Sequence, residues 1–328
     1  MMTEAASTHF ESKEKEITIA RTFNAPRDVV FRAWADPKQL ARWWGPRIFT
    51  TSVCDIDLRI GGAYRFVMRG PDGVEYSMHG VYRDVAPPER IVFTANLDDH
   101  PADWHALLAK SLAGRAKPDS IVLVGVVTFE EAPGATKLSI KTLFELEALC
   151  DAMLKMGMRE GWTESFDRLN DLLSGVSDRE IVITRLFDAP RELLFDAWLD
   201  AKNIGKWWGP RGFTTTIHNM DTRPGGEWRF IMHGPDGVDY DNRVVYREIV
   251  RPSRLVYNHG SDTAGDPGEF LATITFVDLG GKTALTLRAL LGSVEQYEQK
   301  KKFGAIEGGN QTLDRLAEYV SNLKNLIS

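Results

Sequence analysis

The sequence predicts an α+β protein of two similar domains, in each of which a curved antiparallel sheet packs around a long C-terminal helix. Three observations predict this fold class. The chain contains one long segment twice, each copy has the same order of strand and helix patterns, and each copy ends in an amphipathic helix. The 328 residues provide enough chain for two domains of ordinary size.

The internal repeat defines the domains. ITIARTFNAPRDVVFRAWADPKQLARWWGPR begins at Ile17, and IVITRLFDAPRELLFDAWLDAKNIGKWWGPR begins at Ile181, an offset of 164 residues. From Thr128, which matches Thr275, the offset falls to 147, so the first copy carries about 17 extra residues. Two units of this length are too long and too few for a solenoid. We expect a first domain at 15–174 with an insertion at about 97–119, and a second domain at 179–325. The linker between them is short.

Each copy begins with a strand and two short helices. EITIARTF alternates as a strand, and Val30, Phe31 and Trp34 then recur at helical spacing. Asp36 and the proline after it form an N-cap and first turn that begin a second short helix. That helix ends at Gly45, because glycine suits a left-handed cap and the following proline cannot continue the helix.

A run of strands and one long helix complete each copy. In the first domain we expect strands at 49–57, 63–69, 76–85, 90–95, 121–129 and 137–144, with a tight turn at Gly70-Pro-Asp-Gly73. The last segment carries a single apolar stripe that includes Met158, Trp162 and Phe166. An antiparallel sheet of this length must cover one face, and this helix is the only long element available to do so.

The order of elements and several short motifs resemble a known family. The motifs are FxAPRxxxFxAW, RWWGP or KWWGP, GGxxRF, GPDGV and VYR. They are similar to the SRPBCC, or START-like, helix-grip superfamily, and most closely to its group of activator of heat-shock protein 90 ATPase homologues. The resemblance implies two helix-grip domains, each with a cavity between sheet and helix. The superfamily includes lipid carriers, hormone receptors, polyketide cyclases and cochaperone domains.

Composition excludes several classes of function. Forty Lys and Arg against 46 Asp and Glu give a net charge of −6, which argues against nucleic-acid binding. No apolar run reaches the ~18–20 residues that span a membrane, and residues 1–16 lack the pattern of a signal peptide. Two cysteines cannot form a disulfide framework. We therefore expect a cytoplasmic protein without a metal or cofactor.

Catalytic motifs are missing from the sequence, so an enzymatic activity stays unassigned. His79 is a candidate ligand contact, although arginine replaces it in the second copy and a surface role is the alternative. Glu160 and Glu307 occupy matching positions in the two long helices. Each could face the cavity as an acid, a base or a ligand anchor, or could form an ion pair with an arginine of the sheet.

Aromatic and methionine side chains are the stronger sign of a binding site. Alternate positions of one strand carry Tyr64, Phe66 and Met68, and the matching strand carries Trp228, Phe230 and Met232. Rigid aromatics and flexible thioethers suit an irregular apolar ligand, and ordinary core packing is the alternative.

The first domain is predicted to be the better binder. Its insertion contains an amphipathic helix with Trp104, which could close the cavity as a lid or could pack against the second domain. Trp162 of the first long helix is replaced by Gly309, whereas Phe303 replaces Met156 and adds volume to the second copy. The candidate ligand contacts are Tyr64, Phe66, Met68, His79, Trp104, Met158, Glu160, Trp162, Trp228, Phe230, Met232, Phe303 and Glu307.

The resulting hypothesis is a small hydrophobic ligand bound between sheet and helix. The alternatives are a cochaperone-like protein-interaction module, with a chaperone as partner, and a cyclase-like or hydrolase-like enzyme that uses a pocket Glu or His. We expect a monomer or a homodimer, with the two domains related by a pseudo-twofold contact.

Overall fold

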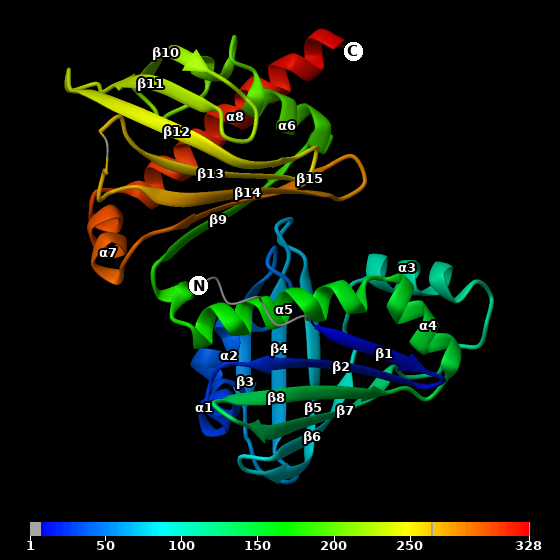
Figure 1. The fold of residues 1–328 in the computed structure, drawn as a ribbon. Coiled ribbons are helices and arrows are strands. Elements are labelled where there is room, and N and C mark those ends of the chain that lie inside the picture. Colours follow the sequence, from blue (N-terminus) through cyan, green and yellow to red (C-terminus); the bar gives the residue numbers. More distant parts are fainter. Residues whose placement is uncertain (1–7, 264, 328) are drawn as a thin grey trace. The chain divides into compact units, whose positions relative to one another are not determined.

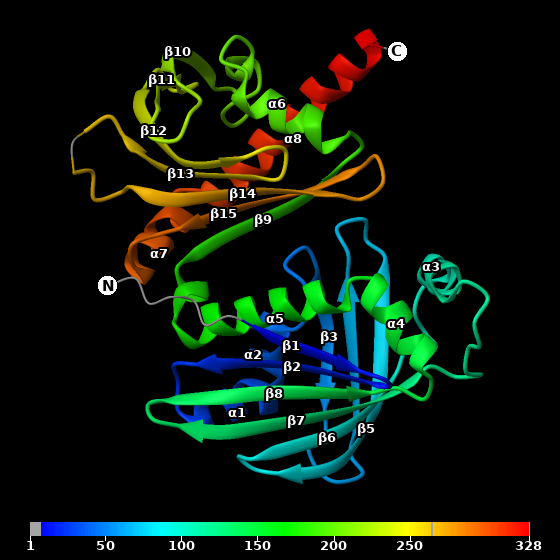
Figure 2. The same ribbon diagram turned by 45° about the vertical axis from the view of Figure 1, so that its right-hand side comes forward.

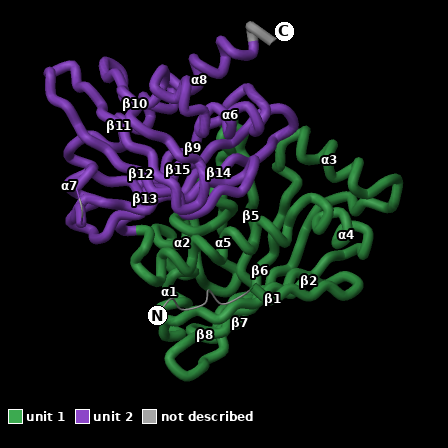
Figure 3. Tube along the Cα trace, turned by 45° about the horizontal axis from the view of Figure 1, so that its top comes forward, with its two compact units in different colours: residues 1–177 green, residues 178–328 purple. Residues whose placement is uncertain are grey.

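The structure of the protein is a computed structural model that describes residues 8–263 and 265–327 (Figure 1). The chain forms two compact units, residues 1–177 and 178–328 (Figure 3), and each unit has its own hydrophobic core. Each unit is an antiparallel sheet with a long C-terminal helix against it. The predicted fold class, two helix-grip domains of mixed α+β content, is confirmed.

The first domain is built on an eight-stranded sheet of order β1-β2-β8-β7-β6-β5-β4-β3, in which every pair is antiparallel. Helix α5 runs across one face of this sheet (Figure 2). The elements are β1 His9–Lys13, β2 Glu16–Phe23, α1 Arg27–Ala35, α2 Pro37–Trp43, β3 Thr50–Ile56, β4 Ala63–Arg69, β5 Glu75–Ala86, β6 Arg90–Asn96, α3 Ala102–Leu112, β7 Val122–Ala132, β8 Ala135–Leu143, α4 Glu147–Lys155 and α5 Met158–Leu173.

The second domain repeats this plan with seven strands in the order β10-β11-β12-β13-β14-β15-β9. Its elements are β9 Glu180–Phe187, α6 Arg191–Leu199, a 3-10 turn at Ile204–Lys206, β10 Thr214–Met220, β11 Glu227–His233, β12 Asp239–Val250, β13 Arg254–Ser261, β14 Phe270–Asp278, β15 Thr283–Leu290, α7 Val294–Lys302 and α8 Ala305–Ile327. The 3-10 turn stands where the first domain has α2. The second copy lacks the proline of α2's first turn and has Gly205 in the interior, which disfavours a helix.

Local chemistry explains the short helices of the first domain. The Asp36 carboxylate accepts a hydrogen bond of 2.8 Å from the backbone N–H of Lys38 and so caps α2. Gly45 has a φ of +85°, and a Cβ at this position would lie 2.5 Å from the Met68 sulfur. The backbone conformation therefore favours glycine there, and the Met68 side chain of β4 would have to shift to make room for a larger residue.

The long helices bury the predicted apolar stripe. Phe166 and Leu169 of α5 are fully buried, as are Leu313 and Leu316 of α8. The Phe166 ring meets the Phe23 ring of β2 edge-on, with 5.6 Å between centroids. The core of each domain thus lies between its long helix and the concave side of its sheet.

Three elements were not predicted from the sequence. Strand β1 pairs with β2 from His9 opposite Ala20 to Lys13 opposite Glu16, although its sequence HFESK is mostly polar. Helices α4 and α7 precede the two long helices and end just before Gly157 and Gly304, which have φ values near +90°. No helix in the described part of the chain is long and apolar enough to cross a membrane.

Candidate functional site

An arginine of the long helix holds the loop after α2 in place. The guanidinium group of Arg168 donates hydrogen bonds to backbone carbonyls at the end of α2 and in the loop after it, and we call this arrangement the arginine clamp. The acceptors are Arg42 at 2.9 Å from Nη2, and Trp44, Gly45, Pro46 and Phe49 at 3.2, 3.0, 3.1 and 3.3 Å from Nη1. Burial lowers the pKa of Arg168 to about 10, so the group stays protonated at neutral pH.

The second domain contains the same clamp. Arg315 of α8 occupies the position that matches Arg168, and its guanidinium reaches the equivalent carbonyls. These are Lys206 at 3.1 Å from Nη2, and Trp208, Gly209, Pro210 and Phe213 at 3.5, 2.9, 3.0 and 3.1 Å from Nη1. Sequence reasoning missed both residues, although an arginine at the same position of two amphipathic helices was visible in the repeat.

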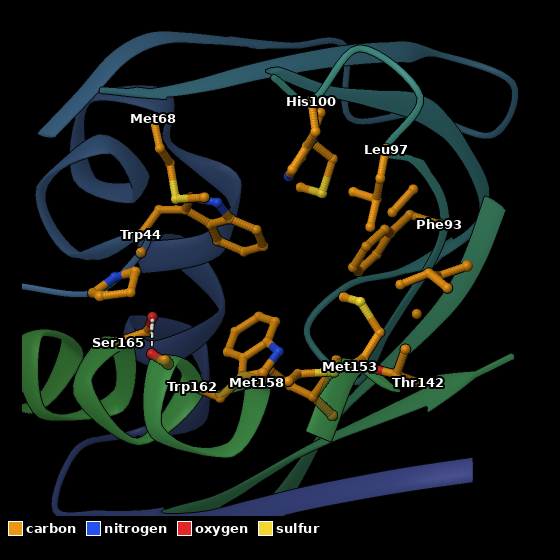
Figure 4. Close-up of a pocket in the computed structure, with 18 of the residues that line it drawn as sticks. Trp44, Met68, Phe93, Leu97, His100, Thr142, Met153, Met158, Trp162 and Ser165 are labelled. Atoms are coloured by element: carbon orange, nitrogen blue, oxygen red, sulfur yellow. Dashed lines mark hydrogen bonds between the residues drawn. The ribbon is translucent and has the colours of Figure 1, made fainter. Parts of the chain in front are cut away.

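The loop held by the clamp forms one wall of a cavity in the first domain. The cavity has a volume of about 210 Å³ and lies between α5 and the concave side of the sheet (Figure 4), and α3 and the segment before it contribute Trp104 and His100 to its lining. Its lining is Trp44, Gly45, Pro46, Met68, Met78, Phe93, Ala95, Leu97, His100, Trp104, Leu123, Gly125, Ile140, Thr142, Met153, Met158, Gly161, Trp162 and Ser165. Most of these side chains are apolar.

Tryptophan rings shape the wall next to the long helix. The Trp162 ring lies edge-on to Trp44, with 5.3 Å between centroids, and is stacked on Trp34 at 6.4 Å. The lining also includes four methionines, at positions 68, 78, 153 and 158, which can adapt their shape to a bound molecule. Aromatic faces and thioethers together give a surface suited to an apolar or aromatic ligand.

Few polar groups reach this lining. His100 comes from the insertion, and its Nδ1 lies 3.0 Å from the carbonyl oxygen of Ser77. Burial lowers the pKa of His100 to about 4, so the ring is neutral at pH 7. The Ser165 hydroxyl already donates to the Gly161 carbonyl at 2.8 Å, and Thr142 contributes a buried threonine from β8.

Four of the candidate contacts named from the sequence lie in this lining: Met68, Trp104, Met158 and Trp162. Their side chains come from β4, α3 and α5, which meet at the cavity only in the folded chain. The ring of Trp104 lies 4.5 Å from that of His100, so the insertion places an aromatic pair beside the cavity. In the two views, α3 also lies next to α4 (Figures 1 and 2).

The other candidates of the first domain lie elsewhere. Tyr64 and Phe66 are buried in the core, where the Tyr64 hydroxyl donates to the Thr94 carbonyl at 2.7 Å. His79 is nearly half exposed, and its Nδ1 lies 3.2 Å from a carboxylate oxygen of Asp99. Glu160 is exposed, because it lies on the face of α5 that points away from the sheet.

In the second domain, the candidate residues divide between core and surface. Trp228 and Phe230 are buried and stacked, with 4.2 Å between ring centroids, and Met232 is partly buried against the same core. Phe303 lies at the end of α7, directly before the turn at Gly304, and because its side chain is 77% exposed it does not add volume to the interior. Glu307 is also exposed and accepts a hydrogen bond from Gln311 at 2.9 Å.

Two positions of the cavity lining, those of Ala95 and Met78, carry more polar residues in the second domain. His259 stands where the first domain has Ala95, and its ring lies 5.9 Å from Phe230 and 5.1 Å from Phe270. Its Nε2 lies 3.0 Å from the amide oxygen of Asn242, which occupies the position of Met78. Burial lowers the pKa of His259 to about 4.

Gly309, which replaces Trp162, lies so close to Ile183 that a side chain there would require Ile183 to shift. A Cβ at this position would lie 2.5 Å from the Cδ1 atom of Ile183. The isoleucine of β9 thus occupies the space that a tryptophan would need, and the interior of the second domain differs from that of the first at several connected positions.

Sequence reasoning missed the small residues of the cavity. Ala95 and Gly125 create space by having little or no side chain, and a Cβ at Gly125 would lie 2.4 Å from the Phe93 ring. The signal available was the repeat itself, in which Ala95 aligns with a histidine. Within the described residues, no group of three or more His, Cys, Asp or Glu could hold a metal ion.

The comparisons with known proteins identify the family. Residues 24–174 and 188–321 each match the family described as activator of Hsp90 ATPase homolog 1-like protein. The chain therefore belongs to this family and contains its domain twice. No curated protein matches the chain.

Several solved structures are similar to one or both domains. A protein from Nitrosomonas europaea is 22% identical over 50% of this chain and 97% of its own, with a TM-score of 0.41. One from Arthrobacter aurescens is 26% identical over 52% of this chain and 92% of its own, with a TM-score of 0.43. The di-domain ARO/CYC BexL from the BE-7585A biosynthetic pathway is 14% identical over 93% of this chain and 98% of its own, with a TM-score of 0.40.

Proposed function

We propose that the first domain binds a small, neutral, mainly apolar molecule in the cavity between its sheet and α5, and that the second domain binds no such molecule. One observation carries this proposal. The cavity exists where Ala95 lines the wall, and the matching position of the second domain holds the ring of His259 among other aromatic rings.

The lining favours a neutral ligand. None of the residues that surround the cavity is Asp, Glu, Lys or Arg. A charged ligand would lose its hydration without gaining an opposite charge, and this loss costs several kcal/mol or more. Burial of apolar surface, in contrast, contributes about 25 cal/mol per Å² removed from water.

Helix α3 of the insertion is placed to help enclose a ligand in the first domain. Helix α3 presents Trp104 to the cavity, whereas Leu107 on the same helix is 49% exposed. Leu108 and Leu112 are buried and anchor the helix to the domain. A helix fixed by one face and exposed on the other suits a cover over the cavity opening.

Binding explains the site better than catalysis does. His100 is the one histidine or acidic residue in the lining, whereas general acid–base catalysis commonly uses a pair of titratable groups. Glu160 and Glu307, which sequence analysis offered as possible pocket acids, are exposed. A chaperone partner, which the family description suggests, is the second candidate function and would use the surface instead.

A titration of the full chain tests the proposal. The neutral fluorescent probe N-phenyl-1-naphthylamine is added to the wild type and to Ala95→His, which copies the second domain into the cavity wall. We expect one probe per wild-type chain and at least a tenfold loss of affinity in Ala95→His. Val92→His is the matched control, because Val92 lies on the opposite face of the same strand.

The outcome separates the parts of the proposal. Equal binding by the wild type and a folded Ala95→His variant would show that the probe does not use this cavity. Two equivalent probes per chain would contradict the assignment of binding to the first domain alone. Thermal unfolding of each variant shows whether its domains remain folded.

A further inference from the structure

The surroundings of His100 in the cavity wall fix the hydrogen-bonding role of each of its ring nitrogens. Nδ1 of His100 lies 3.0 Å from the carbonyl oxygen of Ser77. A carbonyl oxygen can only accept a hydrogen bond, so the hydrogen must be on Nδ1. In a neutral ring the other nitrogen, Nε2, then carries a lone pair and can only accept.

The ring is neutral at physiological pH. Burial in the apolar wall disfavours the charged form, and the nearby His105 acts in the same direction, so the pKa of His100 lies well below 7. The Ser77 carbonyl and Asp99 act in the opposite direction without overcoming burial. Among the described residues, none donates a hydrogen bond to Nε2.

Neighbouring rings hold His100 in place. Its centroid lies 4.5 Å from Trp104 and 5.7 Å from Tyr76, both in edge contacts. His100 lies across the cavity from Trp162 and Met158 (Figure 4). The ring is therefore held in place before any ligand arrives, at the side of the cavity opposite Trp162 and Met158.

We propose that His100 selects the ligand, which is a neutral hydroxylated aromatic compound whose hydroxyl group donates a hydrogen bond to Nε2. This inference rests on the proposed function. The aromatic body fits between Trp44, Trp162 and the methionines, and the hydroxyl donates to the nitrogen that can only accept. A carboxylate would place negative charge against a lone pair, and an ether would leave the acceptor without a donor.

The discrimination follows from hydrogen-bond energetics. A site built to bond a hydroxyl rejects an analogue without the donor, because its own polar group is then buried and unpaired. A net value of about 1.5 kcal/mol for such a bond corresponds to roughly a tenfold difference in affinity. His100 belongs to the insertion, so this selectivity is a property of the first domain alone.

The test compares two ligands of similar shape on the full chain at pH 7. 2-Naphthol carries the hydroxyl donor, and 2-methoxynaphthalene replaces it by an ether. Binding is measured by calorimetry with the wild type, His100→Phe and His100→Gln. Phenylalanine keeps a ring of similar size without the acceptor, and glutamine restores an acceptor oxygen.

We expect wild type to bind 2-naphthol about tenfold more tightly than the ether, His100→Phe to bind both equally, and His100→Gln to recover part of the preference. Equal affinity of the wild type for both ligands, or an unchanged preference in His100→Phe, overturns the role of His100 while leaving ligand binding intact. Binding of neither compound by the wild type contradicts the proposed function itself. The ¹⁵N shift of Nε2 in the wild type provides a second measurement if His100→Phe does not fold: it changes on addition of 2-naphthol, and no change overturns the inference.

Discussion

Replacing Arg168 by methionine should destabilise the first domain and loosen the loop that borders the cavity. Methionine is shorter but retains the apolar part of the side chain, and it donates no hydrogen bonds. Five backbone carbonyls, from Arg42 to Phe49, would then lose the guanidinium that they share. Carbonyls that stay buried after the change carry the full cost of desolvation.

The magnitude follows from the number of donors. Nη1 has two hydrogens for four carbonyl oxygens, so its bonds are shared, and Nη2 adds one bond. Hydrogen bonds from charged groups contribute about 1.5–3 kcal/mol each, and sharing and renewed hydration reduce the total. We expect a loss of about 3 kcal/mol in the free energy of unfolding. For a domain of this size, that corresponds to a fall in Tm of roughly 6–12 °C.

The second domain provides the matched control. Arg315→Met removes the equivalent clamp, and hydrogen exchange followed by mass spectrometry assigns each loss of protection to one domain. Arg168→Met should also weaken binding of the neutral probe, whereas Arg315→Met should leave it unchanged. A change of less than 0.5 kcal/mol in both variants would refute the clamp as a source of stability, because so small a value is typical of ordinary surface substitutions.

Two further predictions concern the interiors of the domains. Gly309→Trp should destabilise the second domain by about 2 kcal/mol in urea unfolding, since the new side chain must displace Ile183. Adding Ile183→Ala to the same chain should restore part of the lost stability. Unchanged stability of Gly309→Trp would mean that the interior has room for the ring. Acid should destabilise the first domain between about pH 6.5 and pH 4, because the unfolded chain protonates His100 while the folded domain, with its pKa lowered to about 4, does not. His100→Phe should reduce this dependence in unfolding measured at pH 7 and pH 5, and identical dependences would contradict the burial of a neutral ring.

The fold was predictable because its signals are local and occur twice. The alternation of β2 and the turn at Gly70 identify their elements from a few adjacent residues. Strand β1 was not predicted, since its residues are polar and its hydrogen bonds depend on β2 being present. Pairing with a neighbour, rather than the pattern of its own side chains, makes this segment a strand.

The cavity was only partly predictable, because large side chains are visible in a sequence and empty space is not. Trp162 and Met68 were identified from their type and spacing. Ala95 and Gly125 leave space for the cavity because their side chains are small or absent, and only the packing of strands and helix shows where that space lies. Glu160 shows the converse, since a matching residue in both copies lies on the surface in the structure.

The presence of the arginine clamp in both domains means that the interior of this fold can change while the loop held by the clamp stays the same. The two copies keep the same five carbonyls around Arg168 and Arg315, yet differ at Ala95 and His259 behind that loop. Where two equivalent positions differ, each residue is therefore already accommodated by one copy of this fold. For protein engineering, the second domain is a guide to residues that can reshape the binding chamber of the first, with the loop left untouched.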